Sequence, residues 1–184
     1  LGILFAKTSF PTNAILPTVW AGSACYGLVR LNLGIMPVGL AWASTTVIIT
    51  GVALMVISAW SARMQTTLPN RLGRLGSAYA GMALVGLGSY TPQGIAAVMY
   101  VFASLSFGLA LSGGLCAVAE ERRLPTNVDQ WNGLSRQMPL YTAALMIAVF
   151  AFAATPGTSG FWGGLFSVVG AFPRQPISAV LTLI

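Results

Sequence analysis

Long uncharged apolar stretches, separated by short polar segments, run along most of the chain. A helix that spans a membrane needs about 20 mainly apolar residues, because each residue adds about 1.5 Å across a hydrocarbon core roughly 30 Å thick. The segments between the stretches contain Arg, Pro, Asn or Gly, which favour helix ends and turns. The pattern predicts spanning helices at residues 14–29, 38–60, 75–90 and 94–119.

A further uncharged region, residues 139–172, contains a helix-breaking sequence near residues 155–160. Pro156, Gly157 and Gly160 lie there within five positions of one another. Proline lacks an amide proton and clashes with the preceding helical turn, and glycine favours turns, so a regular α-helix cannot continue through this sequence. The region is therefore either two spans or one broken span.

Both ends of the sequence contain incomplete apolar runs. Residues 177–184 begin a run that is too short to cross a bilayer, and residues 1–6 look like the end of another run. We therefore expect one all-α membrane domain over residues 1–184, a polytopic helix bundle that is a fragment of a longer subunit. No secretory signal peptide is recognisable, because Lys7 follows the first apolar run instead of preceding it.

The composition supports a membrane protein over a soluble one. Hydrophobic residues make up 56% of the chain and charged residues only 7%, and the mean hydropathy is +0.80. About a quarter of the residues of a soluble domain are normally charged. Since so few charges cannot cover the surface of a soluble domain, lipid is expected to cover much of this one.

The net charge of +6 reflects arginines that are dispersed between the apolar stretches. A nucleic-acid interface would gather them on one face, so we interpret them as topology signals and expect no nucleic-acid partner. If residues 139–172 form one broken crossing, the loops at residues 61–74 and 120–137 share a side of the membrane. Six arginines then lie on that side, against Arg30 and Arg174 on the other: Arg63, Arg71, Arg74, Arg122, Arg123 and Arg136.

The chain contains no histidine, which excludes several classes of chemistry. A Ser-His-Asp triad, a zinc site bound by histidine and a histidine proton shuttle all require that side chain. The two cysteines, Cys25 and Cys116, lie far apart inside apolar stretches without a metal-binding spacing. We interpret both as packing residues and expect no metal site and no cofactor on this chain.

Lys7 is the first candidate for chemistry, since apolar residues precede it and Pro11 follows it. A cation at the centre of a spanning helix costs roughly 2.5–3.5 kcal/mol on insertion scales, so a lysine retained there usually faces water or a partner charge. Such a lysine suits a proton relay, because desolvation readily shifts its pKa. The alternative is a lysine at a helix end that extends to the membrane surface.

The sequence at Pro156, Gly157 and Gly160 is the second candidate. A discontinuous helix exposes unpaired backbone groups and partial dipole charges within a membrane, and such breaks often line ion pathways. The alternative is an ordinary turn between two helices. The sequence lacks both the spacing and the lysine of a phosphate-binding loop, so a nucleotide site is not expected.

Four passages resemble the antiporter-like subunits of respiratory complex I, of the NuoM and NdhD type that corresponds to the fourth mitochondrial ND subunit. The first resembles the family's Phe-Ala-x-Lys-x-Pro segment, and the second its Tyr-Gly-Leu-x-Arg-x-Asn stretch. The other two follow in the family's order and nearly at its spacing. The passages are Phe5-Ala-Lys-Thr-Ser-Phe-Pro11, Tyr26-Gly-Leu-Val-Arg-Leu-Asn-Leu-Gly34, Gly133-Leu-Ser-Arg-Gln-Met-Pro139, and Pro156-Gly-Thr-Ser-Gly-Phe161 followed by Val169-Gly-Ala-Phe172.

The resemblance implies a subunit of NADH:quinone oxidoreductase, built of inverted repeats, that moves protons through a central chain of charged residues. Residues 139–172 would be one discontinuous crossing. NADH, FMN, iron-sulphur clusters and quinone would be bound by partner subunits of the complex, and the chain's own partners would be other membrane-arm subunits and the bilayer. We expect the mitochondrial inner membrane, with a bacterial plasma membrane or a thylakoid as alternatives.

The resemblance also implies that the later middle of a longer subunit is present, as a split-gene product or as part of a longer chain. Members normally carry a His-x-Trp-Leu-Pro run where this sequence passes directly from Phe10 through Pro11 to Thr12. What joins these residues is open at this point.

The departures from the family concern the proton relay. Lys7 matches the family's lysine at the first broken helix, but Gly22 stands where the family has a second lysine. Family histidines correspond to Tyr79 and Ala103, and a family acidic residue corresponds to Gly164. Tyr79 can pass a hydrogen bond and is kept as a weak relay candidate.

The hypothesis from these departures is a pumping architecture whose second half-channel is degraded or rerouted. Two other classes stay open. One is a subunit of a multisubunit cation/proton antiporter or of a membrane-bound hydrogenase. The other is a structural membrane subunit that no longer pumps.

Overall fold

The structure, a computed structural model, describes most of the chain after its first part. The described residues are 19, 23–24, 26–31, 34–35, 37–125, 127, 131 and 133–182. Lys7, Gly22 and Cys25 lie outside them, as do most of the expected span at residues 14–29 and the last two residues of the run at 177–184. What was predicted for these positions stays a prediction.

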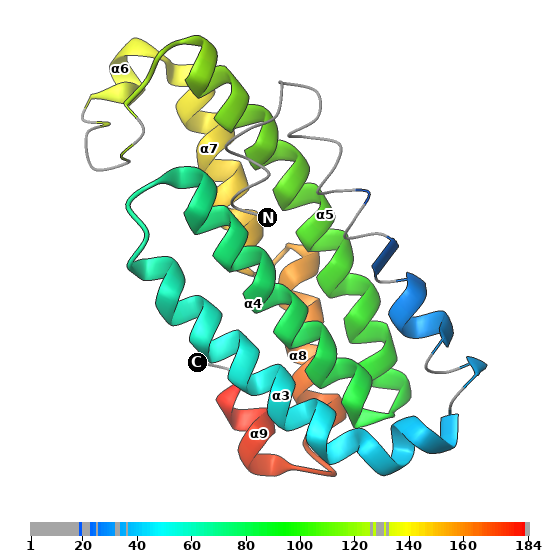
Figure 1. Cartoon of the computed structure of the whole chain (residues 1–184). Coiled ribbons are helices and arrows are strands. Elements are labelled where there is room, and N and C mark those ends of the chain that lie inside the picture. The colour runs from blue at the N-terminus through cyan, green and yellow to red at the C-terminus, as the bar shows by residue number, and fades with distance from the viewer. Residues whose placement is uncertain are drawn as a thin grey trace.

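The described residues form a bundle of helices, as expected for an all-α fold (Figure 1). Within those residues, extended pairing is limited to an isolated bridge between Thr67 and Asn127. The helices are α3 (Pro37–Arg63), α4 (Leu68–Ser89), α5 (Pro92–Glu121), α6 (Leu134–Gln137), α7 (Pro139–Phe152), α8 (Ser159–Ala171) and α9 (Pro176–Leu181).

The helices start where the local sequence favours a start. Thr91 is the N-cap of α5, and its hydroxyl accepts a hydrogen bond from the Gly94 amide at 3.1 Å. Helix α4 begins at Leu68, with a proline in its first turn, so it is longer than the predicted range of residues 75–90. The predicted range starts only after Arg74, because the charged residues were assigned to a loop. The helix includes both Arg71 and Arg74 and so starts in the more polar end of the bundle.

The helices run up and down beside one another (Figure 1). Helix α3 packs against α4, α4 packs against α5, and α5 packs against both α7 and α8. The main core lies between α4 and α5, where the buried side chains include Ala83, Leu87, Val98 and Val101. Helix α9 closes one end of the bundle, where Ala179 packs beside Ile48 of α3.

Glycines allow α3 and α4 to approach backbone to backbone. A Cβ atom at Gly81 would lie 2.6 Å from the carbonyl oxygen of Gly51 and 2.7 Å from the amide nitrogen of Met55. Such distances exclude any side chain on either helix at the crossing. Small residues of this kind are typical of helix pairs in membranes, where close van der Waals packing drives association.

Two described helices are long and apolar enough to cross a membrane, Ala41–Arg63 within α3 and Pro92–Glu121. The ends of the bundle differ in charge. Arg63 ends α3, and Arg71 and Arg74 lie in the first two turns of α4 at the same end of the bundle. The end of α5 and α6 add three more arginines there: Arg122, Arg123 and Arg136.

Arg174 lies at the opposite end, in the connection between α8 and α9. Its Nη1 atom donates a hydrogen bond of 2.7 Å to the Ser44 hydroxyl on α3, and its guanidinium carbon lies 5.8 Å from the centre of the Tyr90 ring at the end of α4. The side chain therefore ties the end of α8 to two other helices, through one hydrogen bond and one cation–π contact.

Replacing Gly81 with alanine should destabilise the bundle. The added methyl group would meet backbone atoms of α3, which can move only if the two helices separate, and overpacking of this kind costs about 1–3 kcal/mol. Gly114→Ala is the matched control, because no atom lies within 4 Å of the Cβ position at Gly114. Thermal unfolding in detergent should show a lower midpoint for Gly81→Ala alone, and equal midpoints for the two variants would contradict the tight crossing.

The end of the bundle that carries six arginines is predicted to face the cytoplasm or its equivalent compartment. Single cysteines introduced by Ser135→Cys in α6 and Gln93→Cys at the start of α5, with the native cysteines changed to serine, sample the two ends. An impermeant maleimide should label position 135 only from the cytoplasmic side and position 93 only from the other. Labelling of both from one side would show that these ends do not lie on opposite sides of a membrane.

Candidate functional site: the break between α7 and α8

Helices α7 and α8 follow one another along α5, with a non-helical connection between them (Figure 1). Helix α7 ends at Phe152 and α8 begins at Ser159. Pro156 and Gly157 lie in the connection, whereas Gly160 lies in the first turn of α8. Each helix is too short to cross a membrane alone, at 14 and 13 residues, so together they have the form of one broken crossing.

The backbone turns out of the helical path at two left-handed positions. Ala154 has a φ of +48° and Gly157 a φ of +101°. Glycine adopts this conformation without a steric penalty, whereas an alanine pays for it, so the surrounding contacts must hold Ala154 in place. Pro156 lies between the two and cannot donate a backbone hydrogen bond.

Both sides of the break meet α5 at the same residue. The Ser104 hydroxyl donates to the carbonyl oxygen of Ala151 at 3.2 Å, and a Cβ atom at Gly160 would lie 2.8 Å from that same hydroxyl oxygen. The end of α7 and the start of α8 therefore lie at the same level along α5. This is the geometry of a helix interrupted midway along its partner.

The carbonyl groups at the end of α7 beyond Val149 have no helical partner, yet those of Phe150, Ala151 and Phe152 each lie within hydrogen-bond distance of a donor. The Ala153 amide makes the last helical bond, to Val149 O at 2.8 Å. The Thr155 hydroxyl then donates to Phe150 O at 3.3 Å, so the connection itself binds one of the groups that a helix end normally leaves open.

The other two carbonyl groups are bound by hydroxyls from neighbouring helices. The Tyr79 hydroxyl of α4 lies 3.0 Å from Ala151 O and 3.1 Å from Phe152 O. Ser104 of α5 shares Ala151 O with it. Tyr79 and Ser104 are only 5% and 3% exposed, so these bonds form away from solvent.

Ring packing holds Tyr79 against the same helix end. Its ring meets Phe152 edge to face, with 5.9 Å between the ring centres. Phe152 in turn lies over Gly108 of α5, where a Cβ atom would approach the Phe152 ring to 2.9 Å. Ser104 and Gly108 lie one turn apart on the face of α5 that receives the end of α7.

The start of α8 is bound differently from the end of α7. Thr158 is its N-cap residue, but the Thr158 hydroxyl donates to Thr155 O at 2.8 Å instead of accepting from the first amides of α8. Those amides therefore receive no side-chain cap. The positive end of the α8 dipole faces the break, beside the Ser159 side chain.

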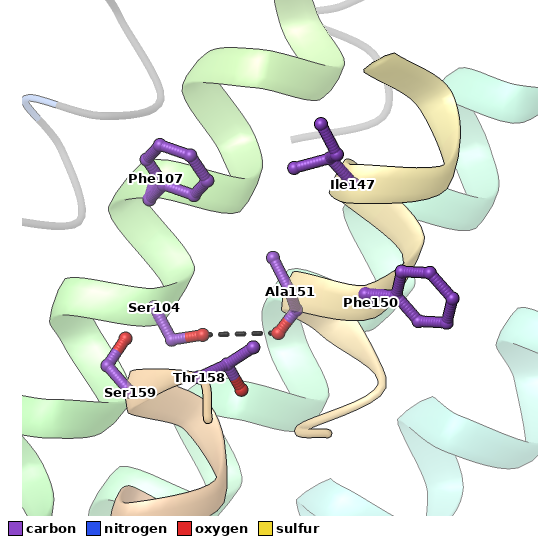
Figure 2. Close-up of a pocket in the computed structure, with 7 residues that line it drawn as sticks. All are labelled: Ser104, Phe107, Ile147, Phe150, Ala151, Thr158 and Ser159. Carbon is purple, nitrogen blue, oxygen red and sulfur yellow. Dashed lines mark hydrogen bonds between the residues drawn. The ribbon is translucent and has the colours of Figure 1, made fainter. Parts of the chain in front are cut away.

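A pocket of about 310 Å³ opens beside the break (Figure 2). Hydroxyl groups from α5 and the start of α8 form its polar side, and large apolar side chains form the rest. Phe107, Ile147 and Phe150 are all exposed, so the pocket opens on the outer face of the described bundle. The lining residues are Ser104, Phe107, Ile147, Phe150, Ala151, Thr158 and Ser159.

Three of the relay positions expected from the sequence lie in the described residues, and they have different surroundings. Tyr79 lies at the break, but Ala103 is exposed on another face of α5, and the Cβ position of Gly164 in α8 lies 3.9 Å from the Met82 side chain. In the described helices, Lys, Asp and Glu are absent between the helix ends. The buried polar side chains of the described residues are hydroxyls: Ser44, Ser58, Ser89, Ser104, Ser112, Ser167 and Thr182.

Sequence reasoning missed the donors at the break other than Tyr79. Ser104, with Gly108 and Ser112, forms a small-residue face on α5, which indicates packing. The face does pack against α7, but Ser104 also binds a backbone carbonyl. Neither spacing nor composition distinguishes these two uses of a serine. Cys116 is buried, and the described residues contain no cluster of three metal-ligating side chains.

Replacing Gly160 with alanine should displace both hydroxyls from the end of α7. The new methyl group would lie 2.8 Å from Ser104 Oγ and 2.9 Å from the Tyr79 hydroxyl oxygen. We expect a loss of about 1–3 kcal/mol of stability from this overpacking. Gly164→Ala is the control, since its nearest neighbour lies at 3.9 Å. Thermal unfolding compares the two, and a Gly160→Ala variant as stable as Gly164→Ala would argue against the described contacts.

The family model of the transmembrane proteins described as "NADH:quinone oxidoreductase/Mrp antiporter, TM" matches residues 5–184. A protein of Picosynechococcus named NAD(P)H-quinone oxidoreductase chain 4 1 is 32% identical over 165 residues, which cover 90% of this chain and 31% of the relative. A chain 4 3 of Trichormus variabilis is 32% identical over 168 residues, which cover 89% of this chain and 30% of the relative. The chain thus spans about a third of the length of these relatives.

The fold has a counterpart among solved structures. A chain from the structure of respiratory complex I from Thermus thermophilus with bound NADH superposes with a TM-score of 0.84 at 24% sequence identity. The superposition covers 90% of this chain and 35% of that chain. Together with the family match over nearly the whole sequence, this likeness confirms a multi-pass membrane helix bundle. The chain belongs to the NADH:quinone oxidoreductase and Mrp antiporter transmembrane family.

Proposed function

We propose that the chain is part of a membrane-arm subunit of an NADH:quinone oxidoreductase and takes part in proton translocation coupled to electron transfer. The observation that carries this proposal is the interrupted crossing formed by α7 and α8 within a chain of this family. Non-helical backbone at membrane depth is tolerated only where protein or water surrounds it, and transporters use such breaks to expose backbone dipoles to ions. The relatives named NAD(P)H-quinone oxidoreductase chain 4 favour this reading within the family.

Lys7 is the proposed relay group of the chain. A lysine amine can bind and release a proton once its pKa is brought near that of its surroundings, whereas hydroxyls and backbone groups only pass hydrogen bonds. Tyr79 remains a weak second candidate on sequence grounds. The helix break at Pro156, Gly157 and Gly160 would lie on the ion path.

Electron transfer would take place on other chains. NADH, FMN, iron-sulphur clusters and quinone are expected on partner subunits, since this sequence has two cysteines and no dinucleotide fingerprint. Other membrane-arm subunits and lipid would cover the apolar side chains exposed on the described helices. On α3 and α7 these include Trp42, Ile49, Ile57, Trp60, Leu140, Met146 and Phe150.

A bacterial plasma membrane or a thylakoid is the proposed location, in place of the mitochondrial inner membrane that was expected from the sequence. The relatives reported above are cyanobacterial, which supports a prokaryotic type of membrane. The six arginines at one end of the bundle would then face the cytoplasm or its equivalent.

Two alternatives have specific support. The family description names Mrp antiporters beside NADH:quinone oxidoreductases, which keeps a cation/proton antiporter subunit open. The absence of Lys, Asp and Glu between the ends of the described helices favours a structural subunit that no longer pumps. Purification of the native assembly distinguishes an oxidoreductase from an antiporter. Flavin and iron-sulphur subunits that co-purify identify the oxidoreductase, and sodium-dependent transport identifies the antiporter.

Replacing Lys7 with methionine should lower the number of protons moved per quinone reduced, because the variant removes the only proposed relay group that can carry a charge. Lys7→Arg is the matched variant, since it keeps the positive charge but does not release a proton at neutral pH. Both should show the same lower ratio in the assembled complex reconstituted into vesicles. An unchanged ratio in Lys7→Met would show that no relay passes through this residue and would favour the structural alternative.

A further inference from the structure

We propose that Tyr79 and Ser104 form a clamp on the C-terminal end of α7, and that Tyr79 is a positioning residue at the helix break and not a proton carrier. The clamp is defined by the two hydroxyls and the carbonyl oxygens of Ala151 and Phe152. It rests on the contacts at the break. Its consequence for proton transfer rests in addition on the proposed function.

The open end of α7 would cost free energy if its carbonyl groups had no partners. A carbonyl group without a partner in a membrane interior costs several kcal/mol, because no water is present to bind it. Val149 O accepts the last helical bond, from the Ala153 amide, and the Thr155 hydroxyl of the connection binds Phe150 O, which leaves Ala151 O and Phe152 O. The described donors to these two carbonyls are the hydroxyls of Tyr79 and Ser104.

The two hydroxyl donors come from two different helices. Tyr79 belongs to α4 and Ser104 to α5, so their shared acceptor, Ala151 O, is fixed against both. Gly160 brings the start of α8 to the same point, with room for no side chain between it and the two hydroxyls. Four helices therefore converge at the clamp, and movement of the break requires these bonds to open.

The proton of the Tyr79 hydroxyl points at backbone carbonyl groups. A group in a proton relay must receive a proton from one neighbour and pass a proton to the next. The Tyr79 hydroxyl donates toward two backbone carbonyl oxygens, which accept hydrogen bonds but have no proton of their own to pass on. Among the described residues, a hydrogen-bonded chain that reaches Tyr79 therefore ends at these two carbonyls.

The test is Tyr79→Phe in the complete assembled complex, reconstituted into lipid nanodiscs for exchange and into vesicles for proton transport. The substitution keeps the ring against Phe152 and removes only the hydroxyl. Hydrogen–deuterium exchange at residues 153–158 should become about tenfold faster, as expected for the loss of one net hydrogen bond. The number of protons per quinone should not fall.

Tyr141→Phe is the matched control. The Tyr141 hydroxyl of α7 also binds a backbone carbonyl of α5, Leu115 O at 3.2 Å, but at the far end of α7 from the break. This variant should leave exchange at residues 153–158 unchanged. Equal acceleration in both tyrosine variants would mean a general loosening of the α5–α7 contact and would overturn the clamp, as would no acceleration in Tyr79→Phe.

Ser104→Ala provides a second test of the clamp, which can still be carried out if Tyr79→Phe fails to assemble. It leaves both Tyr79 bonds in place, so exchange at residues 153–158 should accelerate by only about twofold to threefold. Exchange at the wild-type rate would overturn the shared clamp. Because Ser104 contributes no ring, this variant separates the loss of a hydrogen bond from a loss of packing.

The transport measurement decides the second half of the proposal. A fall in protons per quinone in Tyr79→Phe would identify Tyr79 as a carrier and overturn its positioning role, whatever the exchange shows. If the wild-type complex reduces quinone without moving protons, the proposed function fails, while the exchange comparison still decides the clamp. The two failures are therefore distinguishable.

Discussion

A helix that stops inside a membrane leaves carbonyl groups that only other protein groups can bind, and this constraint organises the bundle around the end of α7. Thr155 of the connection binds the carbonyl of Phe150, and the hydroxyls of Tyr79 and Ser104 bind those of Ala151 and Phe152. The short Ser104 side chain reaches α7 only because α5 and α7 lie close together, whereas the longer Tyr79 side chain reaches it from α4. Gly108 and Gly160 provide that closeness, because neither position has space for a side chain.

The same close packing explains why the protein can be both broken and stable. Along α5, α7 and α8 each keep their own internal hydrogen bonds, and the break is confined to residues 153–158, where the hydroxyls of Thr155 and Thr158 bind nearby carbonyl groups. At the other side of the core, α3 and α4 meet through Gly51 and Gly81 without intervening side chains. Helix contacts of this kind replace the hydrophobic effect, which provides little drive between helices surrounded by lipid.

Much of the architecture could be predicted from the pattern of apolar residues. The runs at residues 38–60 and 94–119 lie within α3 and α5, and Pro156 with Gly157 lies in a connection between two helices. The start of α4 was placed too late, because Arg71 and Arg74 were assigned to a loop although Thr67 and the following proline favour an earlier start. The position of Ser104 at the break could not be predicted, since a serine that binds a distant carbonyl has the same sequence signal as one that only packs. Lys7 lies outside the described residues, so its role in the site stays a prediction.

Helix α5 packs continuously along both halves of the broken crossing, and this has a consequence for how the sequence can change. An inserted residue in α5 between Ser104 and Leu115 would turn everything beyond it by about 100° and misalign α7 against its partner. An insertion in the connection at residues 153–158 would only lengthen that connection. The contacts of α7 with α5 and of α8 with α5 are made by residues outside it. Length variation in this chain is therefore expected to accumulate in the connection, while α5 keeps a fixed number of residues.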